Sequence, residues 1–191
     1  MATGNIAIDR LHLDEVFTGK FVHRPLSQCW KAKCDEELLV IDDDNAKCSR
    51  FTTDRDIADK ALSVINKNKR EIVFLAIDRQ LLTGIEGGIA DCALFDQRQF
   101  RFVEFKTNAE RNAKKNFDKA TKQLKNTLRI FTEKLKSKIQ FDSAVILSCH
   151  VVTSRAFPRN SAMLQNYQLE FALDTEGIFL SFDNKTHWDN I

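Results

Sequence analysis

Short runs of β-branched and aromatic residues predict strands in the middle of the chain. Polar or glycine-containing segments bound these runs, as is usual for strands of a buried sheet. The predicted strands are Glu71–Ile77, Ile89–Phe95, Phe100–Lys106 and Ser143–Val152. A polar turn at Asp96–Gln99 joins the second and third of them into a hairpin.

Helical spacing of apolar residues predicts two helices around these strands. The first covers Asp54–Lys67, where apolar residues recur three and four positions apart behind a Thr-Thr-Asp capping signal. The second follows the third strand, because Thr107 and Glu110 have the spacing of a capping box. Behind that box, one uninterrupted apolar stripe contains Ala113, Phe117, Ala120, Leu124, Leu128, Phe131 and Leu135.

The order helix, three strands, helix, strand predicts an α/β fold, in which a mixed sheet is flanked by helices on both faces. We expect a single domain over residues 1–191, with its core at residues 54–152. Residues 1–50 carry no recognisable motif and are expected to form an N-terminal extension. Residues 153–191 are predicted to be a loop followed by a β-hairpin with strands at Tyr167–Leu173 and Gly177–Phe182.

Composition narrows the class of protein. No apolar run approaches the roughly 18 residues that a membrane-spanning helix needs, and the N-terminus lacks the basic and apolar segments of a secretory signal. The five cysteines are an odd number and include no C-x-x-C pair, which favours reduced thiols over disulfides. We therefore expect a cytoplasmic protein with no membrane partner.

Charge is distributed unevenly along the chain. Residues 109–138, which contain the second predicted helix, hold ten Lys and Arg side chains against three acids, a local net charge of +7. The rest of the chain carries −5. Such segregation suggests that one face meets a polyanion, and Lys114, Lys115 and Lys122 are candidates for binding nucleic-acid phosphates. A solvated outer face of a helix has the same pattern.

The predicted hairpin places three charged residues together. A turn at Asp96–Gln99 pairs Phe95 with Phe100, and this register puts Asp91 directly opposite Glu104. Opposed residues have Cβ atoms roughly 4.5–5.5 Å apart, and side chains alternate along a strand, so Lys106 projects from the same face. The sequence therefore predicts that two carboxylates and an ammonium group converge.

Two facing carboxylates repel each other unless a cation lies between them, and their hard oxygen ligands suit Mg²⁺ or Mn²⁺. A neighbouring lysine can orient a water or stabilise charge that develops on a phosphoryl oxygen. These groups are the equipment that hydrolysis of a phosphodiester needs. The competing interpretation is a surface ion pair between Glu104 and Lys106, which the apolar neighbours on both faces of the strand disfavour.

Ile89-Ala90-Asp91, followed after twelve residues by Glu104-Phe105-Lys106, resembles the signature of the PD-(D/E)xK nuclease superfamily. The predicted order of elements is similar to the αβββαβ core of that restriction-endonuclease-like fold. The resemblance implies a Mg²⁺-dependent nuclease in which Asp91 and Glu104 bind the metal and Lys106 lies beside the attacking water. Ala90 stands where the motif has proline, a departure that changes no ligand.

Further candidates come from the same resemblance. Some branches of the superfamily add a glutamine in the helix after the motif, and Gln123 is similarly placed; an exposed amide on the flank of the helix is the alternative. The superfamily often has an upstream acid, for which the sequence leaves Asp56, Asp59 and Glu86 open. The acidic triplet at residues 42–44 could hold a metal, but it is more typical of a solvated turn.

We therefore predict a metal-dependent nuclease that cleaves nucleic acid, with DNA favoured over RNA, in restriction, defence or repair. The alternative is a non-catalytic module that keeps the nuclease fold in order to bind nucleic acid or a protein. A purely structural subunit of a larger complex is a third interpretation. A homodimer and a separate protein partner both stay open.

Overall fold

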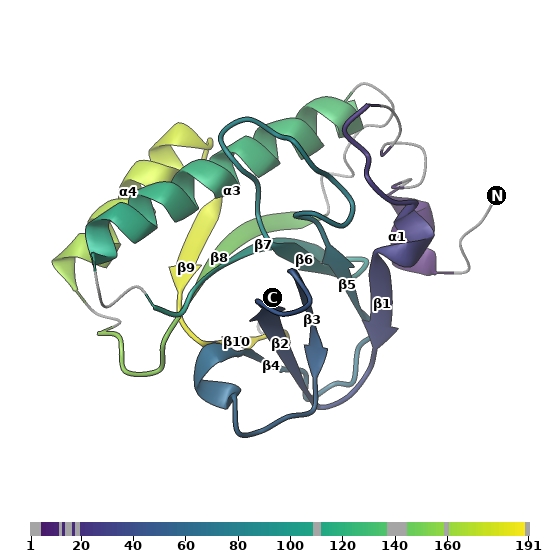
Figure 1. The fold of residues 1–191 in the computed structure, drawn as a ribbon, viewed down its shortest axis with the longest axis horizontal. Coiled ribbons are helices and arrows are strands. Elements are labelled where there is room, and N and C mark those ends of the chain that lie inside the picture. Colours follow the sequence, from purple (N-terminus) through teal and green to yellow (C-terminus); the bar gives the residue numbers. More distant parts are fainter. Residues whose placement is uncertain are drawn as a thin grey trace.

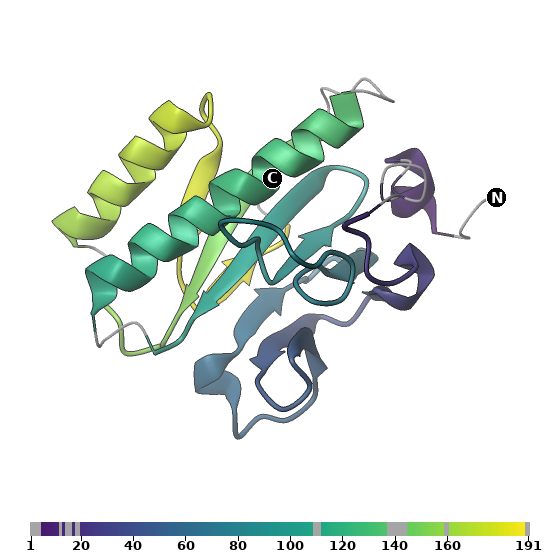
Figure 2. The same cartoon turned by 45° about the horizontal axis from the view of Figure 1, so that its top comes forward.

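A computed structural model describes residues 5–11, 13, 17, 20–108, 112–136, 145–158 and 161–189. In it two β-sheets are stacked face to face, and two helices cover the outer face of the larger sheet (Figures 1 and 2). The expected α/β class is confirmed. The layers, however, are helix, sheet and sheet, where the sequence predicted helices on both faces.

The central sheet has six strands in the order β1-β5-β6-β7-β8-β9. The strands from β1 to β7 in this order run antiparallel to their neighbours, whereas β8 and β9 continue parallel to β7. The strands are β1 (Trp30–Lys33), β5 (Ile72–Ala76), β6 (Cys92–Phe95), β7 (Gln99–Lys106), β8 (Ile146–Thr153) and β9 (Phe179–Phe182). The four strands predicted between residues 71 and 152 thus exist, each with slightly different bounds.

The second sheet has four strands in the order β10-β4-β2-β3. They are β2 (Glu37–Asp43), β3 (Cys48–Thr52), β4 (Leu62–Ile65) and β10 (Lys185–His187). Leu38, Val40, Leu62 and Val64 of this sheet pack against Phe74, Leu94 and Val103 of the central sheet. Trp188, which is fully buried, lies in the same apolar layer.

The opposite face of the central sheet is covered by α3 (Ala113–Lys136) and α4 (Ala162–Asp174), which lie side by side (Figure 2). The predicted apolar stripe of α3 packs on the sheet: Phe117, Ala120, Leu124, Leu128 and Phe131 are buried against Phe100 and Phe102. The capping box expected before this helix includes Glu110, which lies outside the described residues. The described residues also include a short helix α1 (Ile6–Arg10) and the 3-10 turns at Leu26–Gln28 and Ala58–Lys60.

The helix predicted at Asp54–Lys67 is wrong. This segment forms the 3-10 turn Ala58–Lys60 and then β4, whose residues alternate between buried and half-buried positions. Leu62 and Val64 face the central sheet, and β4 pairs with β2 and β10. The helical spacing of four apolar residues was coincidental, because sheet pairing and β-branched residues favour the extended chain here.

The predicted C-terminal β-hairpin is also wrong. Tyr167–Leu173 belongs to α4, which begins after Ser161, whose hydroxyl accepts the Leu164 amide at 3.3 Å. The segment alternates apolar and polar residues as a strand does, but half of its apolar residues face solvent: Leu169 is 61% and Leu173 74% exposed. Gly177–Phe182 contains the expected strand, β9, but β9 and β10 lie in different sheets.

The first 50 residues are not an appendage. β1 forms one edge of the central sheet, and β2 and β3 make up half of the second sheet. All five cysteines are free thiols, as their number and spacing predicted. In the part of the chain that the structure describes, no helix is long and apolar enough to cross a membrane.

Trp188 provides a test of the stacking of the two sheets. Its indole Nε1 donates to Asp96 Oδ2 at 2.8 Å, and the Arg101 guanidinium lies over its ring at 5.4 Å. Trp188→Ala should lower the free energy of unfolding by roughly 3–5 kcal/mol, because it leaves a cavity between the sheets. Trp188→Phe should lower the free energy of unfolding by less than Trp188→Ala does. Urea unfolding measures both, and a loss below about 1 kcal/mol for alanine would contradict this packing.

Candidate functional site

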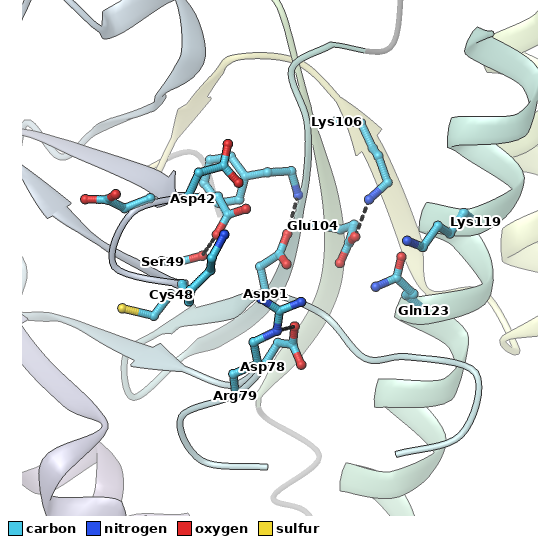
Figure 3. Close-up of a pocket in the computed structure, with 14 residues that line it drawn as sticks. Asp42, Cys48, Ser49, Asp78, Arg79, Asp91, Glu104, Lys106, Lys119 and Gln123 are labelled. Atoms are coloured by element: carbon cyan, nitrogen blue, oxygen red, sulfur yellow. Dashed lines mark hydrogen bonds and ion pairs between the residues drawn. The ribbon is translucent and has the colours of Figure 1, made fainter. Parts of the chain in front are cut away.

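A polar pocket opens at the end of the β6–β7 hairpin, between the second sheet and α3 (Figure 3). Its volume is about 220 Å³, and Asp91, Glu104, Lys106 and Gln123 all line it. Four residues that the sequence singled out, from positions 91 to 123, therefore lie in one cavity. A second cavity of about 260 Å³ adjoins it and shares Lys106 with it.

The predicted register of the hairpin is confirmed. β6 and β7 pair from Cys92↔Val103 to Phe95↔Phe100. Asp91 lies just beyond the last pair, where its side chain replaces the backbone as a partner: the Phe105 amide donates to Asp91 Oδ2 at 2.7 Å. This bond fixes the Asp91 carboxylate at the end of the ladder, because it accepts the amide of the residue that follows Glu104.

Glu104 is the most deeply buried acid of the pocket, with a side chain only 1% exposed. Its Oε1 accepts a short hydrogen bond from the Lys106 ammonium, which is itself 14% exposed. Its Oε2 is buried and has no hydrogen-bond partner among the described residues. A surface ion pair is therefore excluded, because an exposed pair would leave no carboxylate oxygen buried and unsatisfied.

Gln123 is buried as well, which contradicts the interpretation of an exposed amide on the helix flank. Its Nε2 donates to the Ile89 carbonyl at 3.0 Å, so the amide orientation is fixed and Oε1 must be an acceptor. That Oε1 is buried and lacks a partner among the described residues. Two orphaned acceptors thus line one pocket, an arrangement that calls for a cation or a donor from a ligand.

The same turn of α3 holds the segment that leads into Asp91. Thr127 Oγ1 accepts the Ala90 amide at 2.7 Å, and Asn126 Nδ2 donates to the Gly88 carbonyl at 2.7 Å. Gly88 has φ +77°, and a Cβ there would lie 3.0 Å from Gln123 Cγ. Only glycine allows this segment to approach the helix so closely. The helix therefore positions the backbone just before Asp91.

Four further acids line the pocket, three of them from the triplet at residues 42–44. Asp42, on β2, and Asp78, just after β5, line the cavity with Asp91. The acidic triplet at residues 42–44 was interpreted as a turn. Asp43 does cap one, since its Oδ1 accepts the amides of Asn45 and Ala46, but all three carboxylates also line the pocket. Only the stacking of the second sheet brings them there.

The upstream acids left open by the sequence lie elsewhere. Asp56, Asp59 and Glu86 are exposed and line neither this pocket nor the adjoining one. The segment expected to carry the first two as a helix is instead a 3-10 turn and β4, which explains the difference. Glu86 contributes only its backbone, whose carbonyl accepts Asn126 Nδ2 at 3.0 Å.

The acids of the pocket raise one another's pKa. Burial, and then the charge of Asp42, raises the pKa of Asp91 to about 7. Burial and the charge of Asp91 raise the pKa of Glu104 well above its usual range, although Lys106 acts in the opposite direction. The pKa of Asp42 is also raised, by burial and by Asp44. The pocket therefore disfavours full ionisation of its acids unless a cation enters.

The donor set suits a hard divalent cation, since it consists of carboxylate oxygens and an amide oxygen. The orphaned Glu104 Oε2 is the oxygen that such an ion would satisfy. Among the described residues, however, no three His, Cys, Asp or Glu side chains form a group already arranged to hold a metal. The chemistry of the ligands fits Mg²⁺ or Mn²⁺, and the side chains would have to close around the ion.

Comparisons with known proteins add no relative. The sequence matches no family model, and no curated protein or solved structure shows significant similarity to this chain.

The raised pKa of Asp91 predicts how stability depends on pH without metal. Asp91 loses its proton near pH 4 in the unfolded chain but only near pH 7 in the folded protein, so the folded state binds more protons between these values. Stability should therefore fall as pH rises from about 4 to about 7, by at most about 4 kcal/mol from this group at roughly 1.4 kcal/mol per pKa unit.

Asp91→Asn should remove this part of the pH dependence while it keeps an acceptor for the Phe105 amide. Urea unfolding in the presence of a chelator, at several pH values, gives the difference in the free energy of unfolding between the variant and the wild type. A difference that does not change between pH 4 and pH 7 would show that Asp91 is not destabilised when it ionises.

Proposed function

We propose that this protein is a metal-dependent nuclease of the PD-(D/E)xK type, which hydrolyses phosphodiester bonds of nucleic acid. The observation that carries the proposal is Glu104, a buried acid with one oxygen unsatisfied, held between Asp91 and Lys106 in a polar pocket. These three residues occupy the positions of the motif. DNA remains favoured over RNA, and a role in restriction, defence or repair remains the biological expectation.

The order of elements supports the proposal. From β5 to β8 the chain runs through three strands, a helix and a strand, as in the second to last elements of the αβββαβ core. The first helix of that core has no counterpart at residues 54–67, where β4 lies instead. The motif residues lie at the end of the β6–β7 hairpin. The helix that follows, α3, covers the face of the central sheet from which Glu104 projects.

Each residue has a role that follows from its contacts. Asp91 and Glu104 would hold Mg²⁺ or Mn²⁺, which would supply a Lewis acid and lower the pKa of a bound water. Lys106, whose ammonium already reaches Glu104, places a positive charge where a phosphoryl oxygen gains negative charge. Gln123 presents a fixed acceptor to the pocket and can orient a water through its Oε1.

One observation favours the alternative, a non-catalytic module that binds nucleic acid or a protein. Lys106 and Glu104 already form an ion pair, so part of the negative charge is compensated without a metal. In such a module, Lys106 would be a structural partner of Glu104 and no metal would bind. Measurements of metal binding and of nucleic-acid cleavage therefore distinguish the two functions.

Removal of the metal ligand Glu104 or of the neighbouring Lys106 should abolish cleavage and spare folding. Glu104→Ala and Lys106→Ala should each lower the rate of cleavage of plasmid, linear DNA or RNA by at least roughly 10²-fold, the order seen when one preorganised stabilising group is deleted. Without metal, Glu104→Gln should be at least as stable as the wild type, because it keeps an acceptor for Lys106 and removes a buried acid that Asp91 repels.

Glu86→Ala is the matched control, since this exposed acid lies close in sequence but outside the pocket. It should cleave as the wild type does. Calorimetric titration with Mg²⁺ and Mn²⁺ should show binding that Glu104→Ala loses and Glu86→Ala keeps. If the purified wild type cuts no nucleic acid with either ion and binds neither, the nuclease proposal fails and the binding module replaces it.

A further inference from the structure

Five lysines between positions 114 and 125 of α3 fall into two rows, one nearer the pocket and one nearer α4. Lys115, Lys119 and Lys122 are spaced four and three residues apart, so they share one side; we call them the pocket-side row. Lys119 lines the pocket, and the Lys122 side chain passes Gly87, where an added Cβ would lie 3.8 Å from its Cε. The row therefore reaches the cavity that holds Glu104 through Lys119.

Two other lysines, Lys114 and Lys125, are eleven residues apart and so share the side of α3 that faces α4; we call them the outer row. The Lys114 carbonyl accepts the hydroxyl of Tyr167 from α4 at 3.1 Å, and Lys125 pairs with Asp174 at the end of α4. Arg129 belongs to neither row: it lies seven residues after Lys122 and pairs with Glu133 at 3.1 Å and with Asn126 at 3.0 Å. Of the three lysines expected to contact phosphates, Lys114 thus lies on the wrong side of α3 to approach the pocket.

The hollow runs along the first half of α3. The cavity that contains Glu104 is bordered by Lys119 and Gln123, and the adjoining cavity by Asn116, one turn nearer the start of the helix. The two cavities share Asp42, Asp44, Phe105 and Lys106. From Lys115 to Lys122 the helix advances about 10 Å, at 1.5 Å per residue. The pocket-side row therefore spans the same stretch of α3 that borders the hollow.

The opposite wall carries the opposite charge. Asp42 lies across the pocket from α3 (Figure 3). Asp43 and Asp44, which follow it at the end of β2 and the start of the β2–β3 turn, also line the pocket, with Lys47 as a cation among them. Asp43 is paired with Arg50 at 2.8 Å. The carboxylates of Asp42 and Asp44 lie close enough that Asp44 contributes to the raised pKa of Asp42. We call this wall the acidic rim.

We propose that the two walls select a single strand of nucleic acid, whose phosphates lie along the pocket-side row of α3 and whose scissile bond reaches Asp91 and Glu104. The inference rests on the proposed nuclease function and names its substrate class. The cavity contains two buried acceptors without partners, Glu104 Oε2 and Gln123 Oε1, which independently mark it as a ligand site.

The acidic rim is what disfavours a duplex. The two backbones of B-DNA are separated by grooves roughly 6–12 Å wide, so a duplex with one backbone on α3 brings the other close to the opposite wall of so small a cavity. At that range, phosphates and the carboxylates of the rim repel each other with little screening, since the Debye length is about 8 Å at physiological salt. A single strand has no second backbone and avoids this repulsion.

The role of the pocket-side row is tested by measuring nucleic-acid binding under conditions that prevent cleavage. In a chelator, so that no cleavage occurs, fluorescence anisotropy compares a labelled single-stranded oligonucleotide with its duplex. The wild type should bind the single strand at least about tenfold more tightly. Lys115→Gln/Lys122→Gln should weaken that binding about tenfold and flatten the log–log salt dependence by roughly 0.7 for each lost phosphate contact.

The matched control is Lys114→Gln/Lys125→Gln, which removes the same charge from the outer row of the same helix. It should bind the single strand within about twofold of the wild type. Equal weakening by the two double variants would overturn the row as a specific phosphate track. Thermal unfolding of both variants checks that neither effect comes from loss of the fold.

Charge reversal tests the rim. Asp44→Lys should increase duplex affinity by several-fold and narrow the preference for a single strand, whereas Glu36→Lys, the same change at an exposed acid outside both cavities, should not. A wild type that binds duplex as tightly as single strand overturns the proposal. If strand preference and the effect of the row persist but no metal supports cleavage, only the nuclease proposal fails; if cleavage persists but the row has no effect, only this inference fails.

Discussion

The end of the β6–β7 ladder is the constraint on which the pocket depends. Backbone pairing stops at Cys92↔Val103, and the next amide, that of Phe105, is satisfied by the Asp91 carboxylate. A buried amide without an acceptor would be costly, so this bond holds Asp91 in place even though Glu104 repels it. The two acids are therefore kept together by the needs of the backbone, and burial and the charge of Asp91 raise the pKa of Glu104.

The two layers on the central sheet give the pocket its asymmetry. On one face α3 contributes Lys119 and Gln123, and from the other side the second sheet contributes Asp42. Both layers extend past the end of the hairpin, so the cavity lies between walls made by different parts of the chain (Figure 3). A second helix in place of the second sheet, as the sequence predicted, would not have placed the β2–β3 turn there. The second sheet, which the sequence did not predict, is thus the element that determines the charge of the acidic rim.

The parts of the fold and site that the sequence predicted correctly rest on local signals. The turn at Asp96–Gln99 and the strands on either side fix the register, and hence the positions of Asp91 and Glu104, within sixteen residues. The predictions that failed depend on distant contacts. β4 is extended because it pairs with β2 and β10, and α4 is helical although its apolar residues alternate, because Leu164, Tyr167 and Phe171 pack at helical spacing. Asp42 and Asp78 could not have been assigned, since no motif joins them to residues 91–106.

The buried charge of Glu104 bears on the choice between an enzyme and an inert module. A glutamine would fill the same space and could still accept a hydrogen bond from Lys106, without the cost of taking a second ionised oxygen out of water. A purely structural pair with Lys106 therefore explains only Oε1 and leaves Oε2 as a buried acceptor without a partner. A bound cation, or a donor from a ligand, would give that oxygen a partner. The same ligand would lie beside Gln123 Oε1, whose orientation is fixed by the hydrogen bond from Gln123 Nε2 to the Ile89 carbonyl. The electrostatics of the pocket are in this sense incomplete in the protein alone, and a ligand with positive charge or donor groups completes them.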